Sequence, residues 1–381
     1  MKEGWEYKTL GEVAKVFAGG DVPKNRMSKC KKEPFIIPIY TNGIENEGLY
    51  GYTDIARVND LSLTISARGT IGAIFKRNNP FFPAIRLITV CPQNIVDINF
   101  LYYVLLNSTF TKSGTTIPQL TVPMLKQYRF AIPENISIQQ NIANYLDSSF
   151  KLIDEIKNKA LKSLTEAKAL FQSALAEAME SKEGWEYKTL GEVVSFSRGL
   201  TYKKSDEVDY STKVVLRSTN INVDNNSLNI DELKYLNENI EFEEEKLIKK
   251  GSILICMSNG SKKHLGKVAL IEHDYKYAFG GFMGLLTPVI KINSKYLYYT
   301  LTTPKYKEYI KSLSEGANIN NLKIKDIQKY IIPIFPLNEQ NQIVSHLDKL
   351  SSKVRAIEEK YQKIVEECDA LKQAMLRDVF E

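Results

Sequence analysis

An internal repeat governs this chain: the twelve residues KEGWEYKTLGEV occur at 2–13 and again at 182–193. The likeness resumes later in each copy, where FLYYVL (100–105) answers YLYYTL (296–301) and IQQNIANYLD (138–147) answers EQNQIVSHLD (339–348). Self-similarity at this spacing indicates that one structural unit is built twice. The offset grows from 180 residues at the start to 201 at the end, so the middle of the second copy is longer. We therefore predict a duplicated scaffold whose ends match and whose interiors differ.

Each copy ends in a segment with helical periodicity, which we place at 138–180 and 338–381, and neither segment contains Pro or Gly. Apolar residues three and four apart predict a coiled-coil seam. The second seam comprises Leu347, Leu350, Val354, Ile357, Tyr361, Ile364, Cys368, Leu371 and Met375. The first is richer in alanine and comprises Ile142, Leu146, Ile153, Ile156, Ala160, Leu164, Ala167, Phe171, Ala174 and Ala178. On the outward faces we place Lys157, Lys162, Lys360 and Lys363.

The segments 1–137 and 181–337 are predicted to be globular and to mix helices with many short strands. Runs such as IIPIYTNG, LSLTISARG, VVLRSTN and GSILICMSNG are rich in β-branched residues and bounded by Gly or Asn, as strands are. NFLYYVLLNS and KYLYYTLTT are predicted helices under these sheets. Their paired tyrosines, at 102–103 and 298–299, could stack on bases, but core packing is the preferred interpretation.

The fold class predicted is α+β: two mixed α/β domains alternating with two long helices. The second globular segment joins the end of the first helix to the start of the second, and antiparallel pairing brings those two ends together. We therefore predict an antiparallel coiled coil and a pseudo-two-fold internal repeat, as in a symmetric dimer fused into one chain.

Composition argues against several classes of protein. No apolar run reaches the roughly 18 residues of a membrane span, and MKEGWEYK lacks the apolar core of a signal peptide, so we expect a cytoplasmic protein. The four cysteines and three histidines are too scattered for a disulfide framework or a zinc site. FGGFMG (279–284) lacks the glycine spacing of a dinucleotide site, and no phosphate-binding loop motif occurs. We expect a binding protein without catalytic, cofactor-binding or metal-binding residues.

Positive charge is concentrated in the two globular segments. Residues 1–137 carry 16 basic and 11 acidic residues, and residues 181–337 carry 23 and 19, whereas both helical segments are slightly acidic. Two basic globular segments suit contact with a polyanion. An ordinary solvated surface would explain the charge alone equally well.

Several motifs in combination resemble the specificity (S) subunits of type I restriction–modification systems, and the resemblance covers essentially the whole chain. They are the Trp-x-x-x-x-Leu-Gly-Glu opening at 5–12 and 185–192, the Ile-Pro pairs at 132–133 and 332–333, and the Glu-Gln-x-x-Ile-x-x-x-Leu-Asp helix start at 339–348. In the first copy, Ile138 replaces the glutamate of the helix start. ISARGTIGAIFKR (65–77) is similar to the Arg-Gly-x-Ile-Gly hairpin of the family's target recognition domains.

The resemblance implies a non-catalytic subunit that recognises double-stranded DNA. Each target recognition domain would read one half of a bipartite site, and the helices would set the unread gap. Two modification subunits would dock around the helices, supply S-adenosylmethionine and methylate one adenine in each half-site. Restriction subunits using ATP and Mg²⁺ could add translocation and cleavage.

Candidate DNA-contacting residues follow from how proteins read base edges, with Arg or Lys on guanine and Asn or Gln on adenine. For any one of them a phosphate contact or plain solvation is an alternative, and we favour Arg68 and the run 262–264 because turns between strands can enter a groove. The candidates are Asn42, Arg57, Ser66, Arg68, Lys76, Arg77 and Arg86 in the first copy, and Arg217, Ser218, Asn220, Asn259, Lys262, Lys263 and His264 in the second.

Two other functions fit parts of this pattern. One is a stand-alone sequence-specific DNA-binding protein, which would bind its site without a modification partner. The other is a non-catalytic coiled-coil scaffold, for which DNA binding would be weak and insensitive to salt. The twelve identical residues also exceed what a shared structural role requires, so we hypothesise recent DNA exchange between the two halves of the gene.

Overall fold

The computed structural model describes residues 3–108, 110, 119–180, 185–223, 225–315 and 321–381. Of the repeated opening, Lys2 and residues 182–184 lie outside these ranges. The chain divides into two compact units: unit 1 comprises residues 1–161 with 362–381, and unit 2 comprises residues 162–361. Each unit therefore contains one globular part and a portion of two long helices, α4 (Ile136–Ala178) and α9 (Leu337–Phe380).

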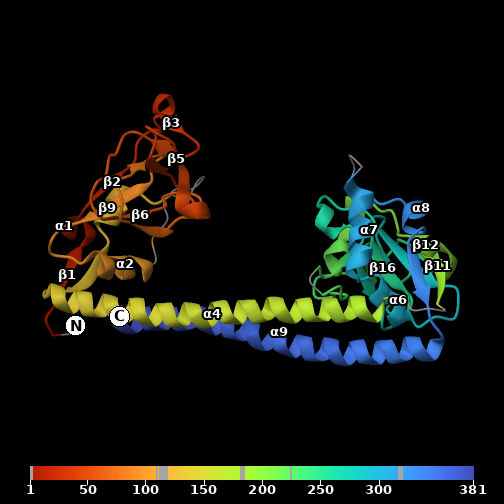
Figure 1. Cartoon of the computed structure of the whole chain (residues 1–381). Coiled ribbons are helices and arrows are strands. Elements are labelled where there is room, and N and C mark those ends of the chain that lie inside the picture. The colour runs from red at the N-terminus through yellow and green to blue at the C-terminus, as the bar shows by residue number, and fades with distance from the viewer. Residues whose placement is uncertain (1–2, 109, 111–118, 181–184, 224, 316–320) are drawn as a thin grey trace. The chain divides into compact units, whose positions relative to one another are not determined.

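Unit 1 contains two four-stranded sheets and a two-stranded ribbon (Figure 1). One sheet has the order β2-β9-β6-β7 and is antiparallel throughout. The other has the order β3-β5-β4-β8, in which only β4 and β8 run parallel. The ribbon pairs β1 with β10. The bounds are β1 Trp5–Thr9, β2 Ala14–Ala18, β3 Met27–Ser28, β4 Ile37–Tyr40, β5 Leu49–Thr53, β6 Ser62–Ile65, β7 Ile74–Arg77, β8 Phe82–Pro83, β9 Ile88–Pro92 and β10 Arg129–Pro133.

Unit 2 repeats this topology strand for strand. Its sheets have the orders β12-β19-β16-β17 and β13-β15-β14-β18, and its ribbon pairs β11 with β20. The pair β14 and β18 is again the parallel one. The bounds are β11 Glu186–Thr189, β12 Val194–Arg198, β13 Glu207–Val208, β14 Lys213–Leu216, β15 Lys234–Leu236, β16 Ile253–Cys256, β17 Val268–Leu270, β18 Ala278–Phe279, β19 Met283–Pro288 and β20 Ile331–Ile334.

The short helices follow local sequence signals. Helix α2 (Ile98–Leu106) begins after Asp97 and α6 (Ser294–Thr300) after Asn293, and in each case the side-chain oxygen accepts two N–H groups of the first turn. Both helices pack on the sheets, and Tyr103 and Tyr299 are buried, which confirms the core interpretation for these two tyrosines. The remaining helices are α1 Leu10–Val13, α3 Val122–Lys126, α5 Leu190–Val193, α7 Pro304–Glu315 and α8 Ile324–Ile327.

In each unit the globular part meets a long helix through the same contacts, which we call the joint. In unit 1, Gln139 of α4 is fully buried; its Oε1 accepts the N–H of Asp97 at 2.8 Å and its Nε2 donates to the carbonyl of Pro133 at 2.8 Å. The Tyr103 hydroxyl donates to Asp147 at 2.6 Å. Burial, together with this bond to a carboxylate, raises the pKa of Tyr103.

Unit 2 reproduces the joint with the equivalent residues. Gln340 of α9 is buried, accepts the N–H of Asn293 at 2.8 Å and donates to the carbonyl of Phe335 at 2.7 Å. The Tyr299 hydroxyl donates to Asp348 at 2.6 Å, and burial and this bond raise its pKa as well. Buried polar groups are costly unless they are hydrogen-bonded, so each glutamine fixes the angle at which the helix leaves its domain.

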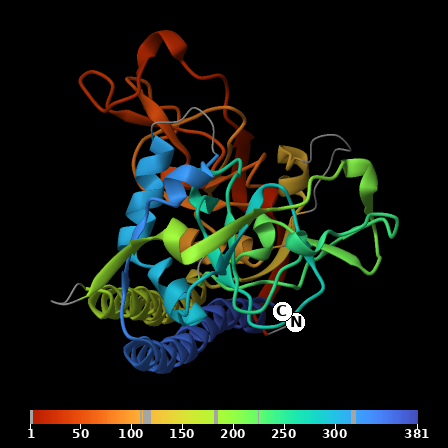
Figure 2. The same ribbon diagram turned by 90° about the vertical axis from the view of Figure 1, so that its right-hand side faces the viewer.

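Segments of α4 and α9 pack side by side and antiparallel in both units. In unit 1 the ion pairs Lys157–Asp369 and Asp154–Lys372, both at 2.6 Å, run in opposite chain directions. In unit 2, Leu175 of α4 shares an apolar cluster with Val344 and Leu347 of α9, where the two helices lie together (Figure 2). The predicted fold class is therefore confirmed. Lys157, which we expected on a face left free for partners, instead bridges the two helices.

The seam prediction was partly wrong. The predicted seam residues Ile156, Ile357 and Leu371 are exposed, whereas Leu376 and Leu175, which lie outside the predicted seam, are buried. The reason is that Leu376 packs into the core of unit 1, beside Phe100 and Phe380, and Leu175 packs on Tyr296 of unit 2. There the globular domain, together with the partner helix, decides which face of the long helix is buried.

The repeated opening forms the first ribbon strand and the short helix after that strand, β1 and α1 in unit 1 and β11 and α5 in unit 2. Thr9 and Glu12 form a capping box at α1, and Thr189 and Glu192 form the same box at α5. These contacts lower the pKa of both glutamates. Leu10 and Leu190 are fully buried, and the Trp5 and Trp185 rings pack against Phe100 and Phe335. Each opening thus anchors its domain at the joint.

All four cysteines, which the structure describes, are free thiols. Within the described residues no helix is long and apolar enough to cross a membrane. The same residues contain no cluster of three or more His, Cys, Asp or Glu side chains able to hold a metal ion.

Candidate nucleic-acid interface

In unit 1 the loops that follow β4, β6 and β8 meet at Asn42, and we call this meeting point the loop junction. Asn42 Nδ2 donates to the carbonyl of Ile85 at 2.7 Å, and its Oδ1 accepts the N–H of Ala67 at 2.7 Å. The neighbouring Gly43 N–H donates to the buried Ser66 hydroxyl at 3.2 Å. Asn42 and Ser66 therefore hold the loops together, which occupies the groups we proposed for base recognition.

The loop after β8 is a tight turn, Ala84–Leu87, closed by a bond from the Leu87 N–H to the Ala84 carbonyl at 3.1 Å. Its central residues, Ile85 and Arg86, have φ of 51° and 58°. A left-handed conformation costs a residue with a β-carbon roughly 1–2 kcal/mol, and a β-branched residue rarely adopts it. The turn is held in place by bonds to the carbonyls of Gly20 and Gly19. It therefore presents Ile85 and Arg86 outward on a fixed backbone.

Basic side chains surround this turn. Arg86 is exposed, and Arg68 is exposed beside Gln119, to whose Oε1 it donates at 2.9 and 3.2 Å. A concave surface of about 680 Å³ lies next to the turn and is lined by Lys24, Arg26, Tyr50 and Ile85, among others. Arg26 is held by Asp54 at 2.5 Å, while Lys24 is exposed. This surface can bind phosphates and present apolar groups together.

Unit 2 builds the same junction from different groups. The backbone carbonyl of Phe282 accepts the N–H groups of Met257 and Ser258 at 2.9 and 3.1 Å, in the place where Asn42 acts in unit 1. Ser218, the counterpart of Asn42, accepts from Asn259 Nδ2 at 2.9 Å. The turn after β18, Gly280–Met283, is closed at 2.8 Å. We call this turn and Ala84–Leu87 the tip turns.

Close backbone approach behind both tip turns requires glycine. A Cβ on Gly19 would lie 2.5 Å from the backbone of Pro83, and a Cβ on Gly199 would lie 2.0 Å from the carbonyl oxygen of Gly280. These separations are shorter than any real contact, so the glycines let the first loop of each unit support the tip turn.

In unit 2 the cations lie on two loops beside the tip turn. Lys262, Lys263 and His264 form a short helical turn after β16, where Lys263 is exposed and Lys262 donates to the carbonyl of Ser314 at 3.1 Å. Desolvation and the charges of Lys267 and Lys263 lower the pKa of His264, so it is neutral near pH 7. Lys203 and Lys204 are exposed on the loop after β12.

Several predicted site residues are placed inside the domain instead. Arg77 is buried, stacks on Tyr40 and donates to Thr64 and to the carbonyl and carboxylate of Glu47. Asn220 is buried and donates to the carbonyls of Asn229 and Glu232. The structure thus assigns Arg77 and Asn220 to the core, because each satisfies groups that burial would otherwise leave unpaired.

Other candidates lie at intermediate positions. Lys76 donates to Asn99 at 2.7 Å at the joint, away from the loops. Arg57 is exposed and stacks on Phe82 at 4.6 Å. Arg217 is half-buried, and its Nε has no hydrogen-bond partner in the described part of the chain. Of the predicted set, the loops therefore bring Arg68, Arg86, Lys262 and Lys263 to the exposed surface around the two tip turns.

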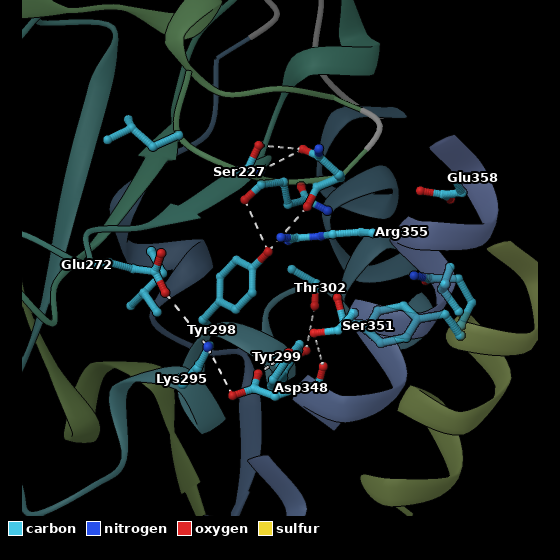
Figure 3. A pocket seen from close by; sticks show the side chains of 18 of the residues that line it. Ser227, Glu272, Lys295, Tyr298, Tyr299, Thr302, Asp348, Ser351, Arg355 and Glu358 are labelled. Carbon is cyan, nitrogen blue, oxygen red and sulfur yellow. Dashed lines mark hydrogen bonds and ion pairs between the residues drawn. The ribbon is translucent and has the colours of Figure 1, made fainter. Parts of the chain in front are cut away.

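A polar cavity of about 640 Å³ lies beside the joint of unit 2 (Figure 3). In it Lys295 pairs with Asp348 at 3.0 Å, and the Tyr298 hydroxyl donates to the carbonyl of Asn226 at 3.1 Å. Burial raises the pKa of Tyr298 to about 12. Arg355 of α9 also lines the cavity. Most of these groups support the joint, so we treat the cavity as a feature of that contact.

One face of α4 in unit 1 exposes an apolar stripe that the seam does not use. Ile138, Tyr145 and Leu152 lie seven residues apart, and Ile156 continues the stripe. Tyr145 and Leu152 are 59% and 61% exposed. Residues at this spacing share one face of a helix, and a contiguous exposed apolar stripe is typical of a protein interface.

Sequence reasoning missed Lys24, Lys204 and the stripe on α4. Both lysines could have been found from the repeat, because Lys24 and Lys204 lie at the same offset of 180 as the openings. The stripe could have been found as a second seven-residue period beside the seam.

Comparison with known proteins identifies relatives of both halves. A family model for the type I restriction modification DNA specificity domain matches residues 2–166 and again 182–366. A putative type I specificity subunit of Mycoplasma pneumoniae is 38% identical over 156 residues, which make up 41% of this chain and 46% of that protein. This chain therefore spans less than half the length of that relative.

Two further matches extend over almost the whole chain. The specificity subunit of the type I restriction enzyme EcoR124I/EcoR124II of Escherichia coli is 23% identical over 372 residues, covering 93% of this chain and 88% of that protein. A chain in a solved structure concerned with complex assembly and conformational transition of the type I R-M system superposes with a TM-score of 0.74 at 18% identity, covering 99% and 97% of the two chains. At that identity the likeness shows the fold alone.

Proposed function

Because this chain belongs to the family of type I restriction–modification DNA specificity proteins, we propose that it selects the DNA site of such a system. Unit 1 reads one half of a bipartite site and unit 2 reads the other. The observation that carries this proposal is that one loop junction is built twice, with the same strand order beneath it and different exposed side chains around it. Two copies of one framework with different tips suit two different half-sites.

The exposed cations of the loops supply affinity, and a smaller number of contacts supply specificity. Lys24, Lys203, Lys204 and Lys263 suit phosphate contacts, which bind all sequences alike and weaken with salt. Arg68 is held in a plane by Gln119, and a fixed guanidinium suits bidentate recognition of a guanine edge.

Catalysis in the proposed complex belongs to partner subunits, and this chain is non-catalytic. Modification subunits would bind S-adenosylmethionine and methylate an adenine in each half-site, after that base has left the stack. Restriction subunits, where present, would use ATP and Mg²⁺ to translocate and cleave DNA. The role of this chain is to hold the two half-sites in position for those partners.

The stripe formed by Ile138, Tyr145, Leu152 and Ile156 is the surface we propose for docking a modification subunit. The equivalent positions of α9 are Glu339, His346 and Lys353, so this apolar stripe is particular to α4. The double variant Tyr145→Ser, Leu152→Ser should lose co-purification with the modification subunit. Leu61→Ser, which changes an equally exposed leucine outside the helices, is the matched control and should retain it.

The decisive test of the function is to map N6-methyladenine in DNA from cells that make this chain with its modification partner. We expect a two-part motif with a fixed unread gap, and its loss when the chain is absent. Replacing the loops of unit 2 by those of a relative should change one half of the motif and leave the other. Methylation that does not depend on the chain, or a motif with a single part, would refute the proposal.

A further inference from the structure

Each tip turn exposes a large apolar side chain on a backbone that is fully tied down. Phe282 of unit 2 is 72% exposed, and Ile85 of unit 1 is 47% exposed. The two turns occupy equivalent positions in their sheets. The N–H of Ala84 donates to the carbonyl of Tyr40, the last residue of β4, and the N–H of Gly280 donates to the carbonyl of Leu216, the last residue of β14. Burying a phenylalanine contributes roughly 1.5–3 kcal/mol, so a folded domain gains nothing from keeping this ring in water.

The backbone at Phe282 is rigid. Its carbonyl accepts two N–H groups, from Met257 and Ser258, and the next residue closes the turn onto Gly280. On the other side, a Cβ on Gly281 would already lie 3.4 Å from Leu200 and Thr201. A side chain displayed on such a support loses little conformational freedom when it binds. The ring is therefore pre-positioned for a partner surface.

The charge around the ring indicates the chemistry of that surface. The loop at 257–264, which bonds to Phe282, carries the exposed Lys263. The loop at 199–202, which supports the turn, leads into the exposed Lys203 and Lys204. An aromatic ring flanked by cations on two sides complements stacked bases between two phosphate backbones. An apolar protein surface would be opposed by the same lysines.

We propose that Phe282 is a wedge that inserts against the bases of the half-site contacted by unit 2, stacking on a base or entering a base step. Wedges of this kind unstack neighbouring bases and kink the duplex. The proposal rests on the proposed function and adds to it the residue through which the DNA is deformed. In unit 1 the position of Phe282 is taken by Arg86, and Ile85, one residue earlier on the same turn, offers a smaller apolar contact.

The test uses the complete complex of this chain with its modification subunits and the duplex whose sequence the methylation map supplies. Phe282→Ala should weaken duplex binding by about 10-fold or more, a loss typical of one base stacked on an aromatic ring. Phe282→Trp should retain affinity. Val289→Ala, which truncates an exposed residue at the other end of β19, is the matched control and should bind as the parent does.

Two readouts separate a wedge from a phosphate contact. With 2-aminopurine placed away from the two adenines that leave the stack for methylation, the parent complex should show a larger fluorescence rise in the half-site of unit 2 than in that of unit 1, and Phe282→Ala should remove the excess. The slope of log affinity against log salt should be unchanged in Phe282→Ala and reduced by about 1 in Lys263→Ala.

Failure of the wedge is distinguishable from failure of the function. If the parent complex methylates a bipartite site and Phe282→Ala binds and methylates that site equally well, the wedge is refuted and the function stands. If Phe282→Ala instead loses its modification subunits, the ring contacts protein and the proposal is also refuted. If the parent directs no methylation, the function itself has failed.

Discussion

The joints and the tip turns differ in what the two units have in common. At the joints, Gln139 and Gln340 each accept the backbone N–H of the residue that caps the next short helix, and Tyr103 and Tyr299 donate to aspartates at the same 2.6 Å. At the tip turns, an asparagine side chain in unit 1 does what a backbone carbonyl does in unit 2. A duplicated framework thus keeps side-chain identity where a helix leaves the domain. Where the loops meet, it keeps only the geometry.

The outer strands β7 and β17 show a third pattern, in which a buried position is kept and its side chain differs between the units. Arg77 of unit 1 is buried, and its counterpart in unit 2, by the pairing of β6 with β7 and of β16 with β17, is the buried Ile271. The same interior position therefore tolerates either a paired cation or an aliphatic side chain. The predictions that follow change one unit at a time, so the other unit serves as an internal reference.

The largest effect is expected from Arg77→Ala. The change empties a buried volume and removes three hydrogen bonds and the stacking on Tyr40, so unit 1 should lose about 3 kcal/mol of unfolding free energy. Hydrogen–deuterium exchange should show faster exchange in unit 1 and no change around Ile271. Arg77→Ile, which copies unit 2, should recover part of the loss. Equal loss in both units would contradict the assignment.

A somewhat smaller effect, equal in the two units, is expected from Gln139→Ala and from Gln340→Ala. Each change leaves a buried backbone N–H and a buried carbonyl unpaired, which costs about 2 kcal/mol. Hydrogen–deuterium exchange should become faster at the joint of the altered unit only. Changing a nearby exposed residue, Gln140→Ala or Gln342→Ala, provides the control. A difference of more than twofold in free energy between the two units would show that the joints are not equivalent.

Removing one hydroxyl at each joint should have a still smaller effect. Tyr103→Phe and Tyr299→Phe keep the ring in the core and remove a bond to a carboxylate, which is worth about 1.5 kcal/mol. Because the phenol donates and its raised pKa keeps it protonated, the loss should be constant from pH 6 to pH 8. Thermal melting of the two single variants measures the loss of stability in each unit. A loss in only one of them would show that the two joints are not equivalent.

The smallest effect, with the opposite sign, is expected at the tip turn of unit 1. Ile85→Gly removes the penalty of a left-handed β-branched residue and should stabilise unit 1 by about 1 kcal/mol. Ile85→Ala keeps a β-carbon and should bring no such gain. DNA affinity should fall in both variants, because the exposed side chain is lost. If the glycine variant is no more stable than the alanine variant, the turn carries no strain.

The sequence predicted the scaffold far better than the loops. Strand runs such as SLTI and ILIC are buried throughout and bounded by turns, so their β-structure follows from local pattern. The roles of Asn42, Arg77 and Asn220 could not be predicted, because their partners lie between 9 and 43 residues away and are brought close only by folding. Arg68 was selected correctly as an exposed residue of a turn; its contact with DNA stays a prediction.

The identity of the two openings exceeds what their contacts require. Tyr7 and Tyr187 are exposed, and the ion pairs Lys8–Glu6 and Lys188–Glu186 lie at the surface, with between 30% and 64% of each side chain exposed. Conservative changes at such positions would cost little. The hypothesis of recent DNA exchange between the halves therefore gains support from the structure of the residues it concerns. Nucleotide sequences that differ at most synonymous positions of the two openings would refute it.

The place of Leu376 in the core of unit 1 affects the order in which the two units can complete folding during synthesis on the ribosome. Unit 2 is a continuous stretch, residues 162–361, and has its whole core once that stretch has emerged. Unit 1 begins the chain but lacks Leu376, Val379 and Phe380 until the last twenty residues follow. Domains usually fold in the order in which they are translated. Here the domain made first is the last that can close, and a truncated message would release a chain with an open apolar face.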